Sequence, residues 1–394
     1  MREGIQVNGE MLRWARESIG LSIDEVVAKL KRKRITNEVV EKWEINEYKP
    51  TYVQLERLAY EVYKRPLAIF FFPEPPEEIS PEESFRTLPE IEIEKLPSRI
   101  RLLMRKAYAL QINLRELFDG RNPAKELITN YISFKTNETV AELANEVRQF
   151  LGVSLEEQKE INDAESAFKF WRNIIEDKGV FVFKDAFRID GYSGFCLFDD
   201  EFPVIYINNT DDHSRQIFTI FHELSHLLFK TGGIDLRQDD FISILEEENK
   251  AIEITCNRFA GEFLVPNDDF LNQINDSTVT PELVSWLADS YNVSLTVIYR
   301  KLLDNGFISN QEYSEKTQEY SEKTKGLDRS NRRGNGGDYY KNMKVYLGLR
   351  YIETVFSRFY QNRINRDQLA EYLGVKQKYI DGMENLLHTR RVSS

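Results

Sequence analysis

One five-residue motif constrains this chain more than any other feature: His222-Glu223-Leu224-Ser225-His226. On an α-helix, residues i and i+4 lie on the same face, about 5–6 Å apart, so two imidazoles at this spacing can bind one metal ion. Glu223 lies beside the first histidine, where its carboxylate can serve as the base for a water molecule at the metal. The chain has only 4 histidines in 394 residues, so a chance match is rare. The motif predicts a helix that carries a metal site.

A third metal ligand is expected from a second helical segment, KAIEITCNRFAGEFLVP at 250–266. Glu253 is the predicted ligand, and Asn257, four residues later, is predicted to orient a ligand histidine from outside the coordination sphere. The alternative is that Glu253 is one exposed carboxylate of an acidic segment, but the apolar residues around it indicate a packed turn. Cys256 is interpreted as a small buried residue rather than as an additional thiolate near the metal.

Two segments, PVIYINNTDDHSRQIFTIFHELSHLLF at 203–229 and EITCNRFAGEFLVP at 253–266, closely resemble the ImmA/IrrE family of metallo-endopeptidases. In that family a strand leads into an arginine-bearing helix with the metal motif, and a downstream E-x-x-x-N-x-F-A segment ends in an apolar-Pro pair. The resemblance covers roughly residues 130–308. It implies a gluzincin-like α+β domain, a Zn²⁺ ion on His222, His226 and Glu253, and cleavage of a specific protein partner such as a repressor or an antitoxin.

The group that stabilises the oxyanion of such a reaction is left open by the sequence. Arg215 lies seven residues before His222 on the same helical face, about 10 Å away along the axis. Tyr192 and Tyr206 are looser candidates for contact with substrate or oxyanion, since each is more often a packed aromatic residue. His213 falls on the opposite face of the helix and is not expected to be a ligand.

The first 72 residues predict a separate domain of short helices, in which Ser22 and Glu25 form a capping box at the start of the second helix. The strings LRWARESIGLSIDEVVAKL at 12–30 and VEKWEINEYKPTYVQLERLA at 40–59 resemble the XRE (Cro/repressor-like) helix-turn-helix family. This resemblance implies a DNA partner. Seven basic or polar residues are the candidates for DNA contact: Lys31, Arg32, Lys33, Arg34, Thr36, Asn37 and Lys42.

The recognition helix expected over 36–44 is nevertheless acidic, because it carries Glu38, Glu41 and Glu44 against one lysine. Three carboxylates facing phosphates are unfavourable. A docking module for a protein with a basic surface is therefore a second interpretation of this domain. The chain is also expected to form a homodimer.

The fold class predicted for the whole chain is multidomain and mainly α, with a small α+β region. After the N-terminal domain (1–72), the expected parts are a linker and helical connector (73–130), a zinc peptidase domain with a helix-turn-helix-like end (131–310), a flexible linker (311–340) and a C-terminal helical domain (341–394). Strands are expected near 179–183, 194–198 and 203–208. The linker at 311–340 rests on the twice-repeated EYSEKT and on NRRGNGGD.

Composition sets limits on location and partners. The chain has 2 cysteines and no apolar run near the roughly 20 residues of a membrane span, so a cytoplasmic protein without membrane contact is expected. The net charge of −12 is uneven: residues 1–70 carry +2, residues 71–324 carry −21 and residues 325–394 carry +7. A nucleic acid should therefore meet the ends of the chain and be repelled by its middle.

Two readings of the metal site stay open at this point. In the first, the chain is a regulatory zinc endopeptidase that cleaves a specific protein. In the second, it is a DNA-binding transcriptional regulator, or a component of a toxin-antitoxin pair, and its metal site serves structure or sensing rather than proteolysis.

Overall fold

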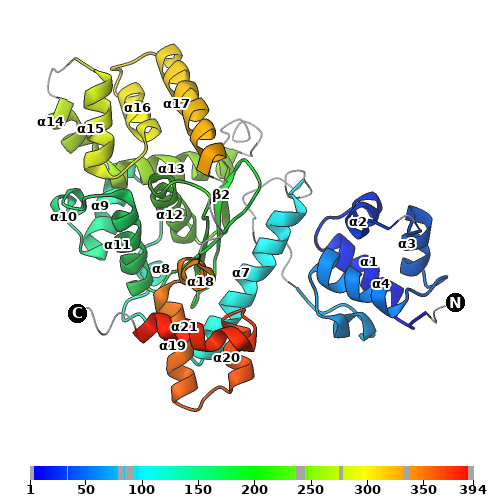
Figure 1. The fold of residues 1–394 in the computed structure, drawn as a ribbon. Coiled ribbons are helices and arrows are strands. Elements are labelled where there is room, and N and C mark those ends of the chain that lie inside the picture. Colours follow the sequence, from blue (N-terminus) through cyan, green and yellow to red (C-terminus); the bar gives the residue numbers. More distant parts are fainter. Residues whose placement is uncertain are drawn as a thin grey trace. The chain divides into compact units, whose positions relative to one another are not determined.

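The computed structural model describes residues 4–32, 34–78, 84, 93, 95–236, 245, 247–274, 278–331 and 338–388. The chain separates into two compact units, Met1–Lys106 and Ala107–Ser394. The described residues are mostly helical, and the second unit holds one small four-stranded sheet (Figure 1). None of the helices in these ranges has both the length and the apolar character needed to cross a membrane.

The first unit is a cluster of short helices: α1 (Gly9–Glu17), α2 (Ile23–Leu30), α3 (Asn37–Glu44), α4 (Tyr52–Arg57), the π-helical turn η1 (Leu58–Tyr63) and the 3₁₀ turn η2 (Leu67–Phe71). The predicted capping box is present, since Ser22 and Glu25 bond each other's backbone N–H groups. Glu44 does not face a partner as predicted. It is buried, and its carboxylate accepts hydrogen bonds from the Arg16 guanidinium at 2.7 and 2.9 Å. The α3 helix therefore presents one carboxylate fewer than the sequence pattern indicated.

The sheet of the second unit has the strand order β1-β3-β2-β4. Its strands are β1 (Phe181–Asp185), β2 (Tyr192–Leu197), β3 (Val204–Asn208) and β4 (Gly233–Leu236). β1 pairs with β3 in parallel, whereas β2 is antiparallel to both β3 and β4. The first three strands match the sequence prediction, and the edge strand β4 was not predicted.

The helix with the metal motif, α12 (His213–Leu228), packs on one face of this sheet and against α13 (Glu247–Leu264). Ile205 and Ile207 of β3 join the same core cluster as the apolar residues of α12 and α13. Because side chains alternate along a strand, Tyr206 lies on the opposite face. There its ring stacks on Phe195, with a centroid distance of 5.1 Å.

Helices surround this layered core and complete the second unit. They are α7 (Ser98–Leu117), whose second half belongs to this unit, α8 (Ile128–Tyr131), α9 (Val140–Leu151), α10 (Leu155–Lys159), α11 (Ala164–Asp177), α14 (Asn267–Ile274), α15 (Pro281–Tyr291), α16 (Leu295–Asp304), α17 (Asn310–Asn331), α18 (Tyr339–Leu347), α19 (Leu349–Tyr360), α20 (Arg366–Tyr372), the 3₁₀ turn η4 (Gln377–Tyr379) and α21 (Ile380–His388).

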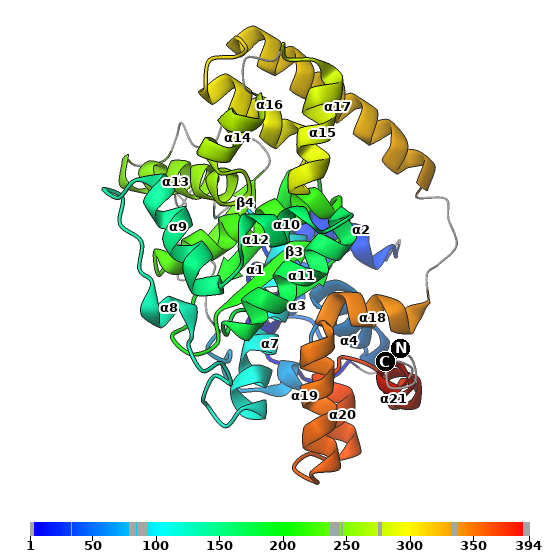
Figure 2. The same cartoon turned by 90° about the vertical axis from the view of Figure 1, so that its left-hand side faces the viewer.

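Helix α17 occupies the first two thirds of the linker that the sequence predicts over 311–340. Ser309 and Glu312 cap the helix start reciprocally, at 2.8 and 3.2 Å. Tyr313 is half-buried, and α17 packs along α16 (Figure 2). The guanidinium of Arg300 lies over the Tyr313 ring at 6.0 Å. The repeat is thus a helix with tyrosines one heptad apart, and 332–337 lie outside the described residues.

The C-terminal helices pack against the sheet and do not form a separate compact unit. Tyr351 of α19 is buried, and its ring meets Phe183 of β1 edge-on at 5.3 Å. Its hydroxyl accepts a bond from Asn113 and donates one to the backbone of Tyr372. These contacts place α18 and α19 over the sheet face that points away from α12.

Candidate metal centre

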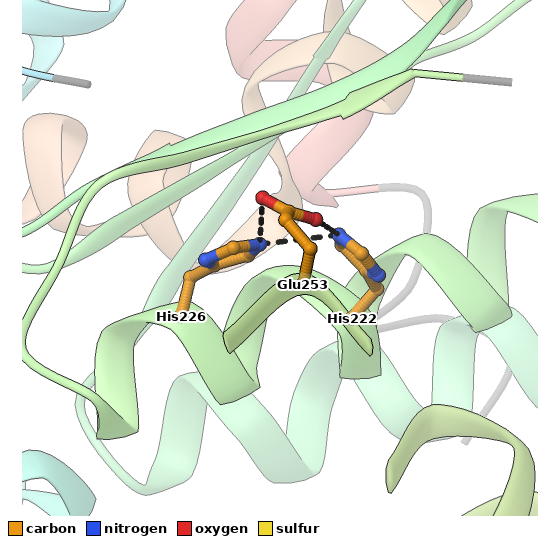
Figure 3. A group of neighbouring side chains, drawn as sticks. All are labelled: His222, His226 and Glu253. Atoms are coloured by element: carbon orange, nitrogen blue, oxygen red, sulfur yellow. Dashed lines mark hydrogen bonds and ion pairs between the residues drawn. The ribbon is translucent and has the colours of Figure 1, made fainter. Parts of the chain in front are cut away.

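Three side chains from two helices converge at the predicted metal site (Figure 3). His222 and His226 project from one face of α12, and Glu253 projects from α13 between them. The two Nε2 atoms are 3.2 Å apart, and the Glu253 carboxylate oxygens lie 3.7 Å from the Nε2 of His222 and 3.3 Å from that of His226. All three donor atoms lie within 4.8 Å of one another. The i,i+4 spacing and the neighbouring helix together build a three-donor set.

The position of α12 explains why these polar groups are buried. The helix begins at an Asp212 cap, whose side chain accepts from the Arg215 backbone N–H, and it runs between the sheet and α13. His222, His226 and Glu253 are each at most 1% exposed. On the sheet side, Gly233 of β4 lies so close to the His226 ring that a Cβ atom at this position would collide with it.

Burial leaves several of these polar atoms without hydrogen bonds among the described residues. Both carboxylate oxygens of Glu253 and the Nδ1 atoms of both histidines have none. Of these groups, the buried Glu253 carboxylate is the one that is costly unless a charge of opposite sign compensates it. The arrangement is therefore better suited to holding a cation than to standing alone.

The pKa directions agree with a mutually dependent cluster. Burial lowers the pKa of His222, which favours the neutral imidazole that a metal ligand must be. Burial also opposes a charge on His226, but Cys256 and Glu253 beside it raise its pKa well above the usual value. The charge of Glu253 thus favours positive charge at the point where the three donor atoms meet.

Glu223 lies in the same buried region and is fully shielded from solvent. Neither of its carboxylate oxygens has a hydrogen bond among the described residues. Burial raises its pKa to about 8. The nearby Cys196 thiol accepts a bond from the Gly233 backbone N–H at 3.2 Å, and burial raises the pKa of this thiol as well. Glu223 is consequently a buried carboxyl group next to the candidate metal ligands, and the Cys196 thiol beside it lowers its pKa against the larger effect of burial.

The structure places three of the other predicted site residues as follows. Asn257 is half-buried on α13 and makes no hydrogen bond to either histidine in the described structure; its orienting role stays a prediction. Tyr206 faces away from α12, because it occupies the other side of the sheet, and its hydroxyl is 3.4 Å from Asp185. Tyr192 starts β2, and its backbone carbonyl accepts from Asn208.

Arg215 is the candidate that the structure ties most firmly to the site. Its Nη2 bonds both carboxylate oxygens of Asp235 on β4, at 2.6 and 2.8 Å, and its Nε bonds the Ser193 hydroxyl at 3.1 Å. The Thr219 hydroxyl also donates to Asp235, at 2.8 Å. Burial raises the pKa of Glu223 most; the charge of His226 opposes this effect, and the charge of Asp235 adds to it.

Sequence reasoning missed Asp235, Ser193, Thr219 and Cys196 as parts of this region. These residues come together only because β2 pairs with β4, and no sequence motif predicts that pairing. The alternation of Ile234, Asp235 and Leu236 after a glycine pair was the signal available for the missing strand.

The candidate DNA-contact residues lie at the turn between α2 and α3. Lys31, Arg32, Arg34 and Thr36 are exposed, and Lys33 lies outside the described residues.

Two further candidates for DNA contact already have partners within the first unit. Asn37 donates to Asp24, and Lys42 pairs with Glu38 at 2.7 Å and lies over the Tyr48 ring at 4.8 Å. The exposed cations at this turn are therefore free to meet a partner, whereas Asn37 and Lys42 would have to change partners.

These features form a donor set that could hold a metal ion: a buried His/His/Glu group on adjacent helices, with a further carboxyl group beside the first histidine. Comparison with protein families agrees. Residues 175–303 match Peptidase_M78, the IrrE N-terminal-like domain. The match covers the sheet, α12 and α13, and it does not extend to the first unit or to the C-terminal helices. No curated protein matches the chain.

Proposed function

We propose that this chain is a zinc-dependent endopeptidase that cleaves a specific protein partner. The observation that carries the proposal is the buried set of two imidazoles and one carboxylate, with Glu223 beside it. Two nitrogen donors and one carboxylate, with a position left over, are typical of catalytic zinc sites. The match of residues 175–303 to a metallopeptidase-type family supports the same activity.

The residues fit such an ion. His222, His226 and Glu253 would hold it, since their donor atoms lie within 4.8 Å of one another and the carboxylate oxygens have no hydrogen bond among the described residues. When bound, a zinc ion polarises the scissile carbonyl and makes water a stronger acid. A dication would also lower the pKa of Glu223 from its raised value, because opposite charge favours the ionised carboxylate.

The chemistry of the chain's own residues centres on Glu223. Its unpaired carboxylate oxygens can accept the proton of the attacking water and return it to the leaving amine. The sheet and α13 exclude bulk water from this carboxylate, so the proton stays at the site. A purely structural metal site needs no such base, and the free acceptor atoms of Glu223 therefore favour catalysis over the structural or sensory alternative.

The substrate and the role of the first unit are part of the proposal. A repressor or an antitoxin is the proposed partner, on the resemblance to ImmA/IrrE proteins. The exposed cations at the α2–α3 turn support contact with DNA phosphates, and the carboxylates of Glu38 and Glu41 support contact with a basic protein. A homodimer would place two such surfaces on one particle.

Metal content and the Glu223→Gln variant test the proposal together. Purified full-length protein should contain about one zinc per chain, His226→Ala should lose it, and Glu223→Gln should keep it. Cells that produce wild type should then contain new protein N-termini that cells with Glu223→Gln lack, as measured by N-terminal proteomics. Zinc retained by His226→Ala would refute the ligand set. Identical N-termini from wild type and Glu223→Gln would favour the structural or sensory reading.

A further inference from the structure

A guanidinium is held rigidly beside the metal centre, and the metal ligands do not need it. Arg215 is fixed by Asp235 and Ser193 from two different strands, and Thr219 donates to the same carboxylate. Asp235 is buried, with 3% of its side chain exposed, whereas 28% of the Arg215 side chain is exposed. The carboxylate thus lies behind the guanidinium, and the guanidinium faces solvent.

This difference in exposure between Arg215 and Asp235 distinguishes their ion pair from a purely structural ion pair of the same unit. Arg172 and Glu176 of α11 are 9% and 5% exposed, so neither partner is available to another molecule. Arg215 keeps donors available. Of its five N–H donors, Nε bonds Ser193 and Nη2 bonds Asp235, and Nη1 makes no hydrogen bond in the described structure.

The guanidinium also lies on the path along α12 toward the metal ligands. Its carbon is 5.2 Å from the centre of the Phe218 ring, and that ring is 6.4 Å from the His222 ring, nearly parallel to it. Phe218 is half-buried, so it forms an apolar surface between the guanidinium and the ligand. At ~3.3 Å per extended residue, about three residues of a substrate strand span this separation.

We propose that Arg215 binds a backbone carbonyl oxygen of the polypeptide substrate, about three residues from the scissile bond, and that Asp235 is its positioning residue. The inference rests on the proposed endopeptidase function. A neutral acceptor is the expected ligand, because Asp235 already compensates the positive charge and a second carboxylate would meet it at short range. Carbonyl oxygens recur along every extended peptide, so this contact would align substrates without selecting their side chains.

Two kinds of zinc-directed probe test this assignment on the full-length, zinc-loaded protein. Acetohydroxamic acid reaches the metal alone. Tetra-alanine peptides with a hydroxamate at the C-terminus, or with a succinyl hydroxamate at the N-terminus, extend from the metal in the two chain directions. Isothermal titration gives the affinity of each probe, and the ratio of peptide to acetohydroxamate affinity isolates contacts away from the metal.

The charge-balanced double variant Arg215→Met/Asp235→Asn should weaken one of the two peptide probes at least tenfold and leave acetohydroxamate within twofold. Arg215→Lys should lose less affinity for that peptide probe, because an ammonium group can still donate hydrogen bonds but lacks the planar paired donors of a guanidinium. Arg115→Met is the matched control, since Arg115 bonds both oxygens of Asp199 elsewhere in the same unit; it should change neither probe.

Two results would overturn the assignment. An equal loss for all probes would show that the pair only supports the metal site, and no loss for either peptide would show that Arg215 does not contact substrate. Zinc content separates these results from failure of the proposed function. Wild-type protein that binds neither zinc nor acetohydroxamate would refute the endopeptidase, and the Arg215 contact with it.

Discussion

Gly233 of β4 lies against the imidazole ring of His226, with no room for a side chain between them. Its backbone N–H also donates a hydrogen bond to the Cys196 sulfur of β2. This bond holds the edge strand β4 at the sheet face against which the His226 ring packs. The glycine therefore limits the orientation of a candidate metal ligand from a strand that contributes no residue to the His222, His226 and Glu253 group.

Gly233→Ala should weaken zinc binding. The added methyl group would push the His226 ring out of its position, and changes in groups that orient ligands typically cost about 10- to 100-fold in metal affinity. Competition with a chromophoric chelator measures the effect. Gly261→Ala on α13 is the control, because a methyl group there meets open space. Equal zinc affinity for Gly233→Ala and wild type would contradict the steric argument.

The candidate metal ligands were readable from the sequence because their spacing is local. Two histidines four residues apart share a helix face wherever the helix lies, and Glu253 sits in a second amphipathic helix. The side of the sheet on which Tyr206 lies could not be predicted, because the face of a strand that is covered depends on which helices pack on it. Asp235 and Gly233 were missed because their position depends on the pairing of β4 with β2.

The helix at the start of the 311–340 segment was not predicted, for a related reason. Its polar repeat carries too few apolar residues for an independent helix, yet packing along α16 and a cap at Ser309 stabilise one. Tertiary contacts of this kind leave no local pattern. The Glu44 assignment was wrong in the same way, because only the position of Arg16 shows that the carboxylate is internal.

Glu44→Gln should destabilise the first unit. It would leave the Arg16 guanidinium, only 13% exposed, with the exposed Glu17 as its charged partner in place of the buried Glu44, and breaking a buried ion pair costs about 3–5 kcal/mol. Urea unfolding followed by tryptophan fluorescence should show the loss, since Trp43 packs in this core. Glu41→Gln, on the exposed side of the same helix, should change the free energy of unfolding by less than about 0.5 kcal/mol. Equal stability of the two variants would place Glu44 outside the core.

Tyr351 should prove necessary for the stability of the second unit. Tyr351→Ala removes a buried ring packed on Phe183 and should cost about 3–5 kcal/mol. Tyr351→Phe removes only the hydroxyl and should cost about 1–2 kcal/mol, since its two hydrogen-bond partners lose a bond. Chemical denaturation of the full chain gives both values. A Tyr351→Ala protein as stable as wild type would show that the C-terminal helices do not support the sheet.

Lys184 should make stability depend on pH in a specific direction. This lysine on β1 is 2% exposed and lies over the Phe168 ring at 4.1 Å; burial, and then the charge of Arg172, lower its pKa to about 7. Between pH 7 and about 10.4, the unfolded chain holds a proton that the folded chain lacks, so stability rises with pH. Below pH 7 Lys184 is protonated in both the folded and the unfolded chain, so the full cost of burying its charge lowers the stability of the folded protein.

Lys184→Met should therefore stabilise the protein most at pH 6, by on the order of 3–5 kcal/mol, and least near pH 10. Urea midpoints at both pH values provide the measurement, with Lys125→Met as the control because that side chain is exposed. A gain that is the same at pH 6 and pH 10 would mean that the pKa of Lys184 is not lowered.

The exposed cations at the α2–α3 turn decide what the first unit binds. If they bind DNA phosphates, replacing Lys31, Arg32 and Arg34 with alanine should weaken binding to every duplex alike and reduce the salt slope by about 1 for each phosphate that is no longer neutralised. Changing Asn37 or Lys42 should instead alter sequence preference. On binding DNA, Asn37 would give up its hydrogen bond to Asp24 and Lys42 its ion pair with Glu38, and each would contact a base edge in its place.

Fluorescence anisotropy of full-length protein on its own promoter DNA, between 50 and about 200 mM salt, measures both effects. Glu47→Gln, on the exposed turn after α3, is the control for a general change in charge. If no salt-dependent binding is found, while residues 1–72 still capture the substrate protein, the DNA interpretation fails. The acidic side chains of Glu38 and Glu41 would then be the recognition surface, and the substrate would have to present a basic one.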